Sequence, residues 1–466
     1  MSLLPAIRAE SFAETIGGAD YGEVFLEASA GTSIRFEDSR VEDVGAVAER
    51  GLGARFLRRA EGGVEGAVET YLGSAQSLEA AEAARIRRGL LGGGELSAPV
   101  RFGPVDSHRH LVRTDPTEIP LDAKIGLLRA IDRALRAEFP RVRQVSLSYG
   151  ERRRETVTLN SEGAHRREER VSLVFSVNVV AQESGVLQTG HEVLGGLKGW
   201  EILEDGEALR AARAAALRAH KKLSAPVAKA GEMPIVISSA AGGTFIHEAI
   251  GHSLEADHVQ EGSSPAYKGR LGEAVAPENI TVIDDPTLPF HRGSFKFDDE
   301  GLLARPTALV KDGVLCDYLY DRATAMREGK SSNAHGRRES FRHRPIPRMS
   351  NLYIAPGRDD PREILRSLKA GIFVTRMGGG QVNTATGEFV FEVDEGYWVE
   401  DGELRHMVRD ANLLGVGPEV LRSIDKVGWD AGWGIGTCGK DGQGVPVGDG
   451  QPTLRVPKIL IGGRHD

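Results

Sequence analysis

The chain has 466 residues, of which 40% are hydrophobic and 27% are charged, a composition typical of a globular protein with two or three domains. Its 59 basic and 67 acidic side chains give a formal net charge of −8, which provides no case for a nucleic-acid partner. The sequence has two cysteines, no apolar run of about 18 residues and no N-terminal signal-peptide pattern, so we expect a cytoplasmic protein without a disulfide framework or a transmembrane helix.

Residues 1–223 are expected to form an α+β domain that contains the same helix–strands–helix unit twice. The first unit has helices near Leu3–Ile16 and Ser74–Arg87, and the second has helices at Leu121–Phe139 and Glu207–Leu223, where apolar residues recur at helical spacing. The strands between them are expected at Val24–Ala28, Thr32–Phe36, Val41–Ala48, Gly53–Leu57, Gln144–Tyr149, Glu155–Asn160 and Val171–Val180. This order predicts helices packed against a mostly antiparallel sheet.

Two histidines, His108 and His110, lie in the connection between the two units. A His-x-His pair on a strand can bind a metal ion, although a polar loop next to two prolines is the simpler interpretation.

The stretch from Pro234 to Asp257, PIVISSAAGGTFIHEAIGHSLEAD, organises the rest of the chain. A strand-like run passes through Gly242 and Gly243 into an amphipathic helical pattern, for which Thr244 is the expected N-cap. The helix carries the motif His-Glu-x-x-x-His, which places two imidazoles on either side of a carboxylate in sequence.

The spacing of the two histidines predicts a distorted helix. His247 and His252 are separated by i, i+5, about 140° around an ideal α-helix, whereas the i, i+4 pair of the familiar zinc-protease helix is only about 40° apart. A π-bulge at Ala249–His252 would return both rings to one face, and Gly251 has the backbone freedom to accept it. We expect His247 and His252 as metal ligands and Glu248 as a free general base; the alternatives are a Glu248/His252 ligand pair at i, i+4 and a chance match.

Residues 224–466 are expected to form a mostly antiparallel β domain around this helix. Asp312-Gly313 and Asp401-Gly402 lie between apolar runs, and such dipeptides are the strongest short signals for hairpins. Met377–Gly380 is expected to be a loop in which Gly378 and Gly379 let the backbone approach a substrate, although a plain turn is an equal alternative.

A basic segment, Asn333–Gly357, contains five arginines and a single acidic residue, Glu339. Arg337 and Arg338 in this segment are candidates for binding a substrate carboxylate. The alternative is that they form structural ion pairs.

Cys438 lies in a glycine-dense segment, expected to be a loop, with little apolar sequence around it. A thiolate is a good third zinc ligand, and two histidines with one cysteine would leave a fourth position for water. Cys316, in the run VLCDYLY, instead fits a small buried strand residue.

Four segments together closely resemble the TldD/PmbA (TldD/TldE) peptidase family: GGTFIHEAIGHSLEAD, FDDEG at Phe297–Gly301, GRRESFRHRPIPRMSN, and CGKDGQGVPVGDGQPTL. The chain resembles the TldD side, because the TldE (PmbA) side lacks the His-Glu-x-x-x-His helix. The resemblance implies a zinc metallopeptidase that acts on unfolded peptides, with Zn²⁺ on His247, His252 and Cys438 and with Glu248 as the base. It also implies a site enclosed at a dimer interface with a TldE/PmbA-like subunit, although a homodimer remains open.

Two other functions are compatible with the same residues. In one, the chain is a non-catalytic peptide-binding scaffold whose metal is structural, and a closed set of four protein ligands would identify it. In the other, Cys438 is the nucleophile of a cysteine hydrolase with a histidine base, which leaves the position of Glu248 unexplained.

Overall fold

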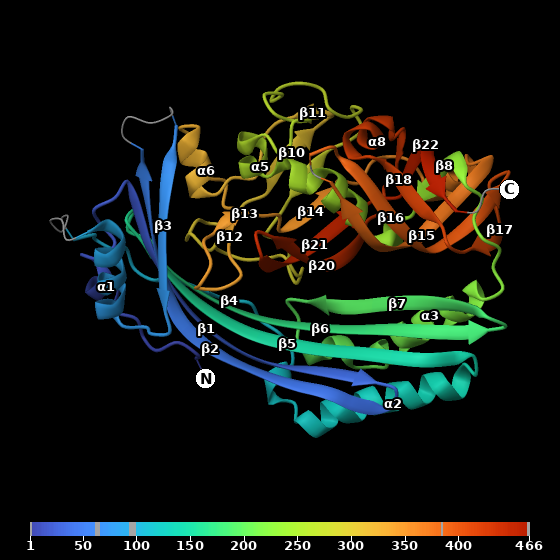
Figure 1. Cartoon of the computed structure of the whole chain (residues 1–466), viewed down its shortest axis with the longest axis horizontal. Coiled ribbons are helices and arrows are strands. Elements are labelled where there is room, and N and C mark those ends of the chain that lie inside the picture. Colours follow the sequence, from blue (N-terminus) through green and yellow to red (C-terminus); the bar gives the residue numbers. More distant parts are fainter. Residues whose placement is uncertain (1, 61–65, 93–98, 384, 464–466) are drawn as a thin grey trace.

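The N-terminal half is built around one twisted seven-stranded sheet (Figure 1). The computed structural model describes residues 2–60, 66–92, 99–383 and 385–463. The strands of this sheet are β1 (Tyr21–Glu37), β2 (Arg40–Arg59), β3 (Val68–Ala75), β4 (Asp106–Arg109), β5 (Val142–Asn160), β6 (His165–Glu183) and β7 (Val186–Gly196). Their order is β3-β2-β1-β5-β6-β4, and β7 also pairs with β6. Because β1 and β5 pair antiparallel along most of their length, two three-stranded meanders join into one sheet.

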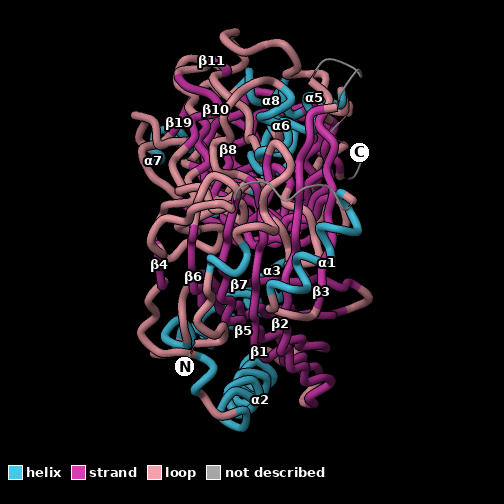
Figure 2. The backbone as a smooth tube through the Cα atoms, turned by 90° about the vertical axis from the view of Figure 1, so that its left-hand side faces the viewer, coloured by secondary structure: helices cyan, strands magenta, loops and turns pink. Residues whose placement is uncertain are grey.

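Helices cover one face of this sheet. α2 (Leu121–Glu138) and α3 (Glu207–Lys222) pack beneath β5 and β6, where Leu128, Ile131 and Leu135 of α2 meet the alternate buried residues of β6 (Figures 1 and 2). α1 (Ala80–Leu91) covers the other end of the sheet with a separate core. The helix–sheet layers follow from the helical and alternating apolar periods in the sequence.

The C-terminal half contains a six-stranded sheet and a closed barrel. The sheet has the order β11-β10-β9-β14-β21-β20, with β9 (Val282–Asp284), β10 (Thr307–Lys311), β11 (Val314–Leu315), β14 (Asn351–Ile354), β20 (Gly432–Lys440) and β21 (Gln443–Gln451). The barrel runs β15-β8-β22-β18-β16 and closes because β16 also pairs with β15. Its strands are β8 (Gly231–Ile237), β15 (Ala370–Val382), β16 (Glu388–Glu400), β18 (Asn412–Val416) and β22 (Leu454–Gly462), with β17 (Glu403–Val408) and β19 (Lys426–Val427) attached.

The remaining elements of this half are short. They are a two-stranded ribbon of β12 (Gly336–Arg337) and β13 (Ile346–Pro347), and the helices α4 (Thr244–Ile246), α5 (Ala256–Glu261), α6 (Arg322–Arg327), α7 (Pro361–Arg366) and α8 (Gly417–Ser423). The helix that carries the His-Glu-x-x-x-His motif, called here the motif helix (residues 244–254), packs between the barrel and the six-stranded sheet. Phe245 in this shared core lies edge-on against Phe389 and Phe391 of β16.

The expected α+β class and the mostly antiparallel sheets are confirmed. Both Asp-Gly hairpins form, since β10 pairs with β11 and β16 pairs with β17 around these turns. Among the described residues, no helix is long and apolar enough to cross a membrane.

Some local predictions were wrong. The N-terminal helix is only a 3-10 turn at Ala9–Phe12, and β3 and β7 were not predicted. Gly378 and Gly379 are not in a loop but in β15, where the pairing with β16 is irregular. Cys316 is exposed rather than buried.

A cluster of buried charges lies between the two halves and is called here the inter-half charge cluster: Glu23 and Arg55 from the N-terminal sheet, and Glu300, Asp321 and Arg338 from the C-terminal half. Arg55 Nη2 lies 3.1 Å from Glu23 Oε2 and also contacts Glu300 Oε1, while Arg338 Nη2 contacts the other oxygen of Glu23. Arg55 therefore faces carboxylates of both halves, and Arg338 faces Glu23 of the opposite half, which offsets part of the cost of burying these charges.

Candidate metal centre

The motif helix is a composite of three helix types. α4 is followed by a π turn at His247–Gly251 and then a 3-10 turn at His252–Leu254, which confirms the predicted distortion. Gly251 has ordinary helical torsions, but a Cβ there would lie 2.1 Å from Met349 Sδ, so the glycine is required by close packing rather than by backbone freedom.

Two glycines bring the start of the helix against β21. Gly242 has φ +74°, and a Cβ on Gly243 would lie 2.3 Å from the Gly450 nitrogen. The helix N-cap is Gly243, so the predicted capping role of Thr244 is wrong. The Thr244 hydroxyl instead donates to Asp449 Oδ2 at 3.4 Å.

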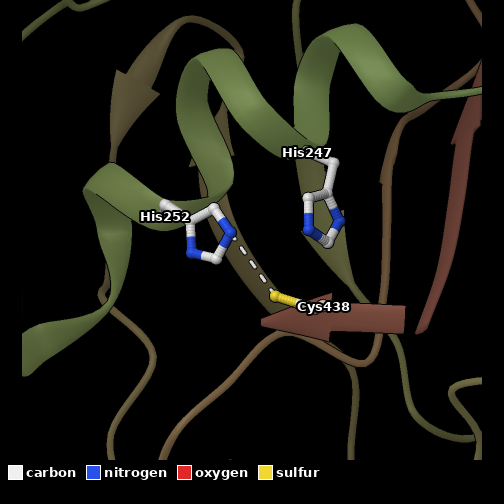
Figure 3. A group of neighbouring side chains, drawn as sticks. All are labelled: His247, His252 and Cys438. Carbon is white, nitrogen blue, oxygen red and sulfur yellow. Dashed lines mark hydrogen bonds between the residues drawn. The ribbon is translucent and has the colours of Figure 1, made fainter. Parts of the chain in front are cut away.

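The π turn brings both histidines to one side of the helix, opposite Cys438 of β20 (Figure 3). One potential ligand atom from each of His247, His252 and Cys438 lies within 4.8 Å of the other two. His252 Nε2 is 3.4 Å from Cys438 Sγ, and the two imidazole centroids are 5.2 Å apart. All three side chains are buried, and the structure thus brings together the three residues that the sequence analysis named as metal ligands.

His252 is held by an acidic residue that sequence reasoning missed. Its Nδ1 lies 2.9 Å from Glu255 Oε2, which leaves Nε2 directed at Cys438. Glu255 is fully buried, and Lys440 Nζ donates to the same carboxylate at 3.1 Å. The sequence signal was present, because Glu255 follows His252 by one helical turn, i, i+3.

Lys440 and Arg348 fix the strand that carries Cys438. Lys440 Nζ also donates to Asp257 Oδ1 at 2.7 Å and to the Pro347 carbonyl at 3.0 Å. Arg348 Nη2 donates to the Cys438 carbonyl at 2.5 Å. Lys440 therefore ties β20 to the residues that follow His252, so that the thiol and the imidazoles are positioned by one hydrogen-bonded network.

The electrostatics of the centre favour a thiolate beside a protonated imidazole. Burial opposes ionisation of Cys438, but hydrogen bonds and charges from His247 and His252 lower its pKa to about 5. Burial likewise opposes protonation of His252, but the Glu255 carboxylate raises the pKa of His252 well above its usual value. In return, although burial opposes ionisation, Lys440 and His252 hold the pKa of Glu255 far below its usual range.

Glu248 lies next to this group without joining it. Its side chain is half-buried and forms no hydrogen bond within the described part of the chain. Its neighbour is Asp449, whose pKa is raised by burial and by the Glu248 charge, although His247 lowers it. Glu248 is therefore available to act as a proton acceptor, whereas Asp449 was not foreseen from the sequence.

The donor set fits zinc. Two imidazoles and a thiolate are typical zinc ligands, and His247 Nδ1 is buried without a hydrogen-bond partner in the described structure. Among the described residues, the converging group has these three members, which matches a catalytic site with an open fourth position better than a closed structural one.

The other predicted site residues lie elsewhere. Arg338 pairs with Glu23, which favours the structural ion-pair alternative for this residue. Arg337 instead donates hydrogen bonds to the carbonyls of Met349 and Pro446. His110 Nε2 is 2.7 Å from Glu168 Oε1, and its ring is 4.5 Å from that of His108.

Sequence comparisons show the family of the chain. Models of the PmbA/TldA metallopeptidase domains match residues 22–86 (domain 1), 114–223 (central domain) and 230–463 (C-terminal domain). The chain belongs to the PmbA/TldD metallopeptidase family. It is 35% identical to a metalloprotease TldD homolog of Haemophilus influenzae, over 96% of this chain and 93% of the relative.

Two further relatives are informative. A zinc metalloprotease TldD homolog of Saccharolobus solfataricus is 28% identical over 73% of this chain and 76% of its own. The crystal structure of TldE from Thermococcus kodakarensis has a TM-score of 0.70 at 16% identity, over 97% of this chain and 99% of that one, and so shares the fold. Family membership and these names support a metal-dependent protease.

Proposed function

We propose that this chain is a zinc-dependent peptidase that hydrolyses peptide bonds of unfolded peptides and small proteins. His247, His252 and Cys438 hold the metal, and Glu248 is the general base. The observation that carries the proposal is the π turn, because it converts an i, i+5 spacing into two imidazoles that face one thiol. The zinc metalloprotease name of the Saccharolobus solfataricus relative supports the choice of metal.

The residues of the chain divide the chemistry between them. When bound, zinc lowers the pKa of water and polarises a carbonyl group. Glu248 accepts a proton from the attacking water and returns it to the leaving amine. Glu255 orients His252, while Lys440 and Arg348 hold the strand of Cys438.

The position of β20 suggests how a peptide binds. β20 is the edge strand of its sheet and carries Cys438, so an extended peptide added to that edge would bring its backbone to the centre. Main-chain pairing reads little sequence, which agrees with action on unfolded peptides.

A dimeric partner is part of the proposal. Residues 40–51 of β2 extend past its pairing with β3, so this edge has no strand beside it among the described residues. Val44 and Val47 on it are 42% and 49% exposed. We propose that a TldE/PmbA-like subunit, or a second copy, covers this edge and encloses the site. The mass in solution should be that of a dimer, and a monomer that cleaves peptides at full rate would refute the requirement.

The function is tested by two variants that are expected to differ in zinc binding. Glu248→Ala should keep bound zinc but lose on the order of 10²-fold or more of peptide hydrolysis, because it removes a base and not a ligand. Cys438→Ala should lose zinc affinity. Metal analysis and an assay on an unfolded peptide are made on both. Hydrolysis retained by metal-loaded Glu248→Ala would rule out the mechanism.

The alternative of a peptide-binding scaffold with a structural metal makes a different prediction. In that case the zinc-loaded chain, with its partner present, should bind unfolded peptide and leave it intact.

A further inference from the structure

A pocket of 370 Å³ lies where the N-terminal sheet meets β20, the strand that carries Cys438. It is lined by the end of β7, by residues 289–292 and by Trp433–Ile435 of β20. In Figure 1, β7 runs alongside β20, and a Cβ on Gly195 of β7 would lie 2.5 Å from Ile435 Cδ1. Both halves of the molecule thus build this pocket.

The walls are mostly apolar. The His291 ring packs against Trp433 with centroids 4.2 Å apart, and Leu194 and Ile202 line the pocket with Ile435. Phe290 is 56% exposed and has φ +65°, a conformation that a bulky residue rarely adopts. Its carbonyl accepts from the Leu197 nitrogen at 3.1 Å, which holds it there. An exposed aromatic ring kept in a strained conformation at a pocket is typical of a binding site.

Two cations line the pocket without carboxylate partners. Neither Lys198 nor Arg292 forms an ion pair with any described residue, and no acidic residue is among the lining residues. Arg292 Nε donates to the Gly436 carbonyl at 3.0 Å, and Nη2 donates to Thr437 Oγ1 at 3.1 Å. Its Nη1 is left without a partner in the described structure, and burial alone lowers the pKa of Arg292 to about 10. An anionic ligand would supply the missing countercharge.

The pocket is adjacent to the candidate metal centre. Arg292 binds the two residues that precede Cys438, and a Cβ on Gly434 would lie 3.0 Å from Asp449 Oδ2. Ile435 is three positions from Cys438, about 10 Å along an extended strand. A peptide that lies along β20 with its scissile bond at the metal would therefore reach the pocket about three residues away.

We propose that this pocket binds the C-terminal residue of an extended peptide, with its apolar side chain between Trp433 and β7 and its free α-carboxylate on Lys198 and Arg292. This inference rests on the proposed peptidase function, because it states where the C-terminal residue of a peptide substrate aligned along β20 would bind. The chain would then release short C-terminal fragments of about three or four residues from unfolded peptides.

The test compares two fluorescein-labelled heptapeptides, Gly-Ser-Gly-Ser-Gly-Ser-Leu with a free carboxylate and the same peptide as its C-terminal amide. Binding is measured to the zinc-loaded full-length Glu248→Ala chain in the oligomeric state in which it is purified. The acid is expected to bind about 10-fold more tightly than the amide, because only the acid makes charge-assisted hydrogen bonds. Replacing its last Leu with Ser is expected to weaken binding about 5-fold, because an apolar contact is lost.

Variants assign the effect to the pocket. Lys198→Met and Arg292→Gln should each reduce the preference for the acid to about 3-fold or less. The matched control is Lys311→Met, which removes the same charge at an exposed position on β10 outside the pocket and should leave the preference unchanged. Equal binding of acid and amide to the parent chain, or a preference that survives both pocket substitutions, would overturn the proposal.

The failure of this inference is separable from that of the peptidase function. Hydrolysis of a long unfolded peptide by the unsubstituted chain, with fragments identified by mass spectrometry, tests the peptidase. Cleavage without a bias toward C-terminal fragments removes the pocket assignment alone. A preference for the acid without any cleavage supports the pocket and removes the peptidase.

Discussion

The molecule contains two buried clusters of ionisable side chains, and they differ in how their charges are matched. In the inter-half charge cluster, Arg55 and Arg338 lie against the carboxylates of Glu23 and Glu300. In the candidate metal centre, one donor atom from each of His247, His252 and Cys438 converges with the other two. Buried charge by itself therefore does not mark a functional site in this chain. The candidate site is distinguished by three converging lone-pair donors that a network of surrounding residues holds in position. In that network Glu255 contacts His252, Lys440 contacts Glu255, and Arg348 contacts the carbonyl of Cys438.

The comparison predicts that breaking the inter-half charge cluster affects folding but not metal binding. Arg55→Met removes the cation that faces both Glu23 and Glu300 and leaves buried carboxylates uncompensated. We expect a loss of about 3–5 kcal/mol in the free energy of unfolding, measured by urea denaturation of the metal-free chain. Zinc affinity of the fraction that remains folded should be unchanged.

The control for this variant is Arg85→Met. Arg85 pairs with Glu82 in an exposed i, i+3 pair on α1, so its removal should leave the denaturation midpoint in place. If Arg55→Met had no more effect than this control, the buried ion pairs would not hold the two halves together.

The second prediction concerns Glu255, whose substitution should affect metal binding more than folding. Glu255→Gln keeps the shape of the side chain but removes the negative charge that orients His252 and binds Lys440. Zinc affinity should fall about 10–100-fold, as is usual when the group that orients a metal-bound histidine is lost. A competition assay with a chelator measures the affinity, and Co²⁺ substitution with visible spectroscopy reports whether the ligand geometry has changed.

A second readout keeps this prediction distinct from a loss of folding. Unfolding of the metal-free Glu255→Gln chain should change less than that of Arg55→Met. An unchanged zinc affinity and an unchanged Co²⁺ spectrum would mean that Glu255 serves only the packing of the helix.

Much of the fold was predictable because its signals are local. The helical spacing of Leu121–Phe139 and the Asp-Gly turns depend on neighbours in sequence, and these elements form as expected. β1 and β2 are longer than predicted, and their polar residues belong to single continuous strands. In β1, Glu27 binds Arg154 of β5, and such long-range contacts are not visible in sequence.

The geometry of the candidate metal centre was predictable in part for the same reason. The His247/His252 spacing specifies a π turn, and the chemistry of Cys438 identifies a third donor, although Cys438 lies in a strand and not in a loop. Asp441-Gly442 after it was an overlooked hairpin signal. Lys440 reaches Glu255 only through the tertiary fold, so no sequence pattern could have indicated that contact.

The most gradual expected effect, spread over several pH units, is a difference in how the two clusters respond to pH. Glu255 has a lowered pKa, so its contribution to stability is present at neutral pH and is lost as pH falls through the pKa of the folded state. Glu300 behaves in the opposite way. Burial raises its pKa from 4.5 to about 7, and Arg55 offsets this only in part because Asp321 and Glu23 lie nearby.

Between pH 4.5 and about 7 the folded chain therefore binds the Glu300 proton more tightly than the unfolded chain does. The tighter binding of this proton makes the free energy of unfolding fall as pH rises through that range. The slope is at most about 1.4 kcal/mol per pH unit, the value for a difference of one bound proton between the folded and unfolded states. Glu300→Gln is neutral at every pH, so the slope of unfolding free energy against pH should become less negative between pH 5 and 7. Urea denaturation of the metal-free chain at several pH values measures both slopes, with Glu82→Gln on the exposed face of α1 as the control for a lost surface carboxylate. Identical slopes for Glu300→Gln and the unsubstituted chain would show that Glu300 is fully ionised in the folded state, held by Arg55 as an ordinary ion pair.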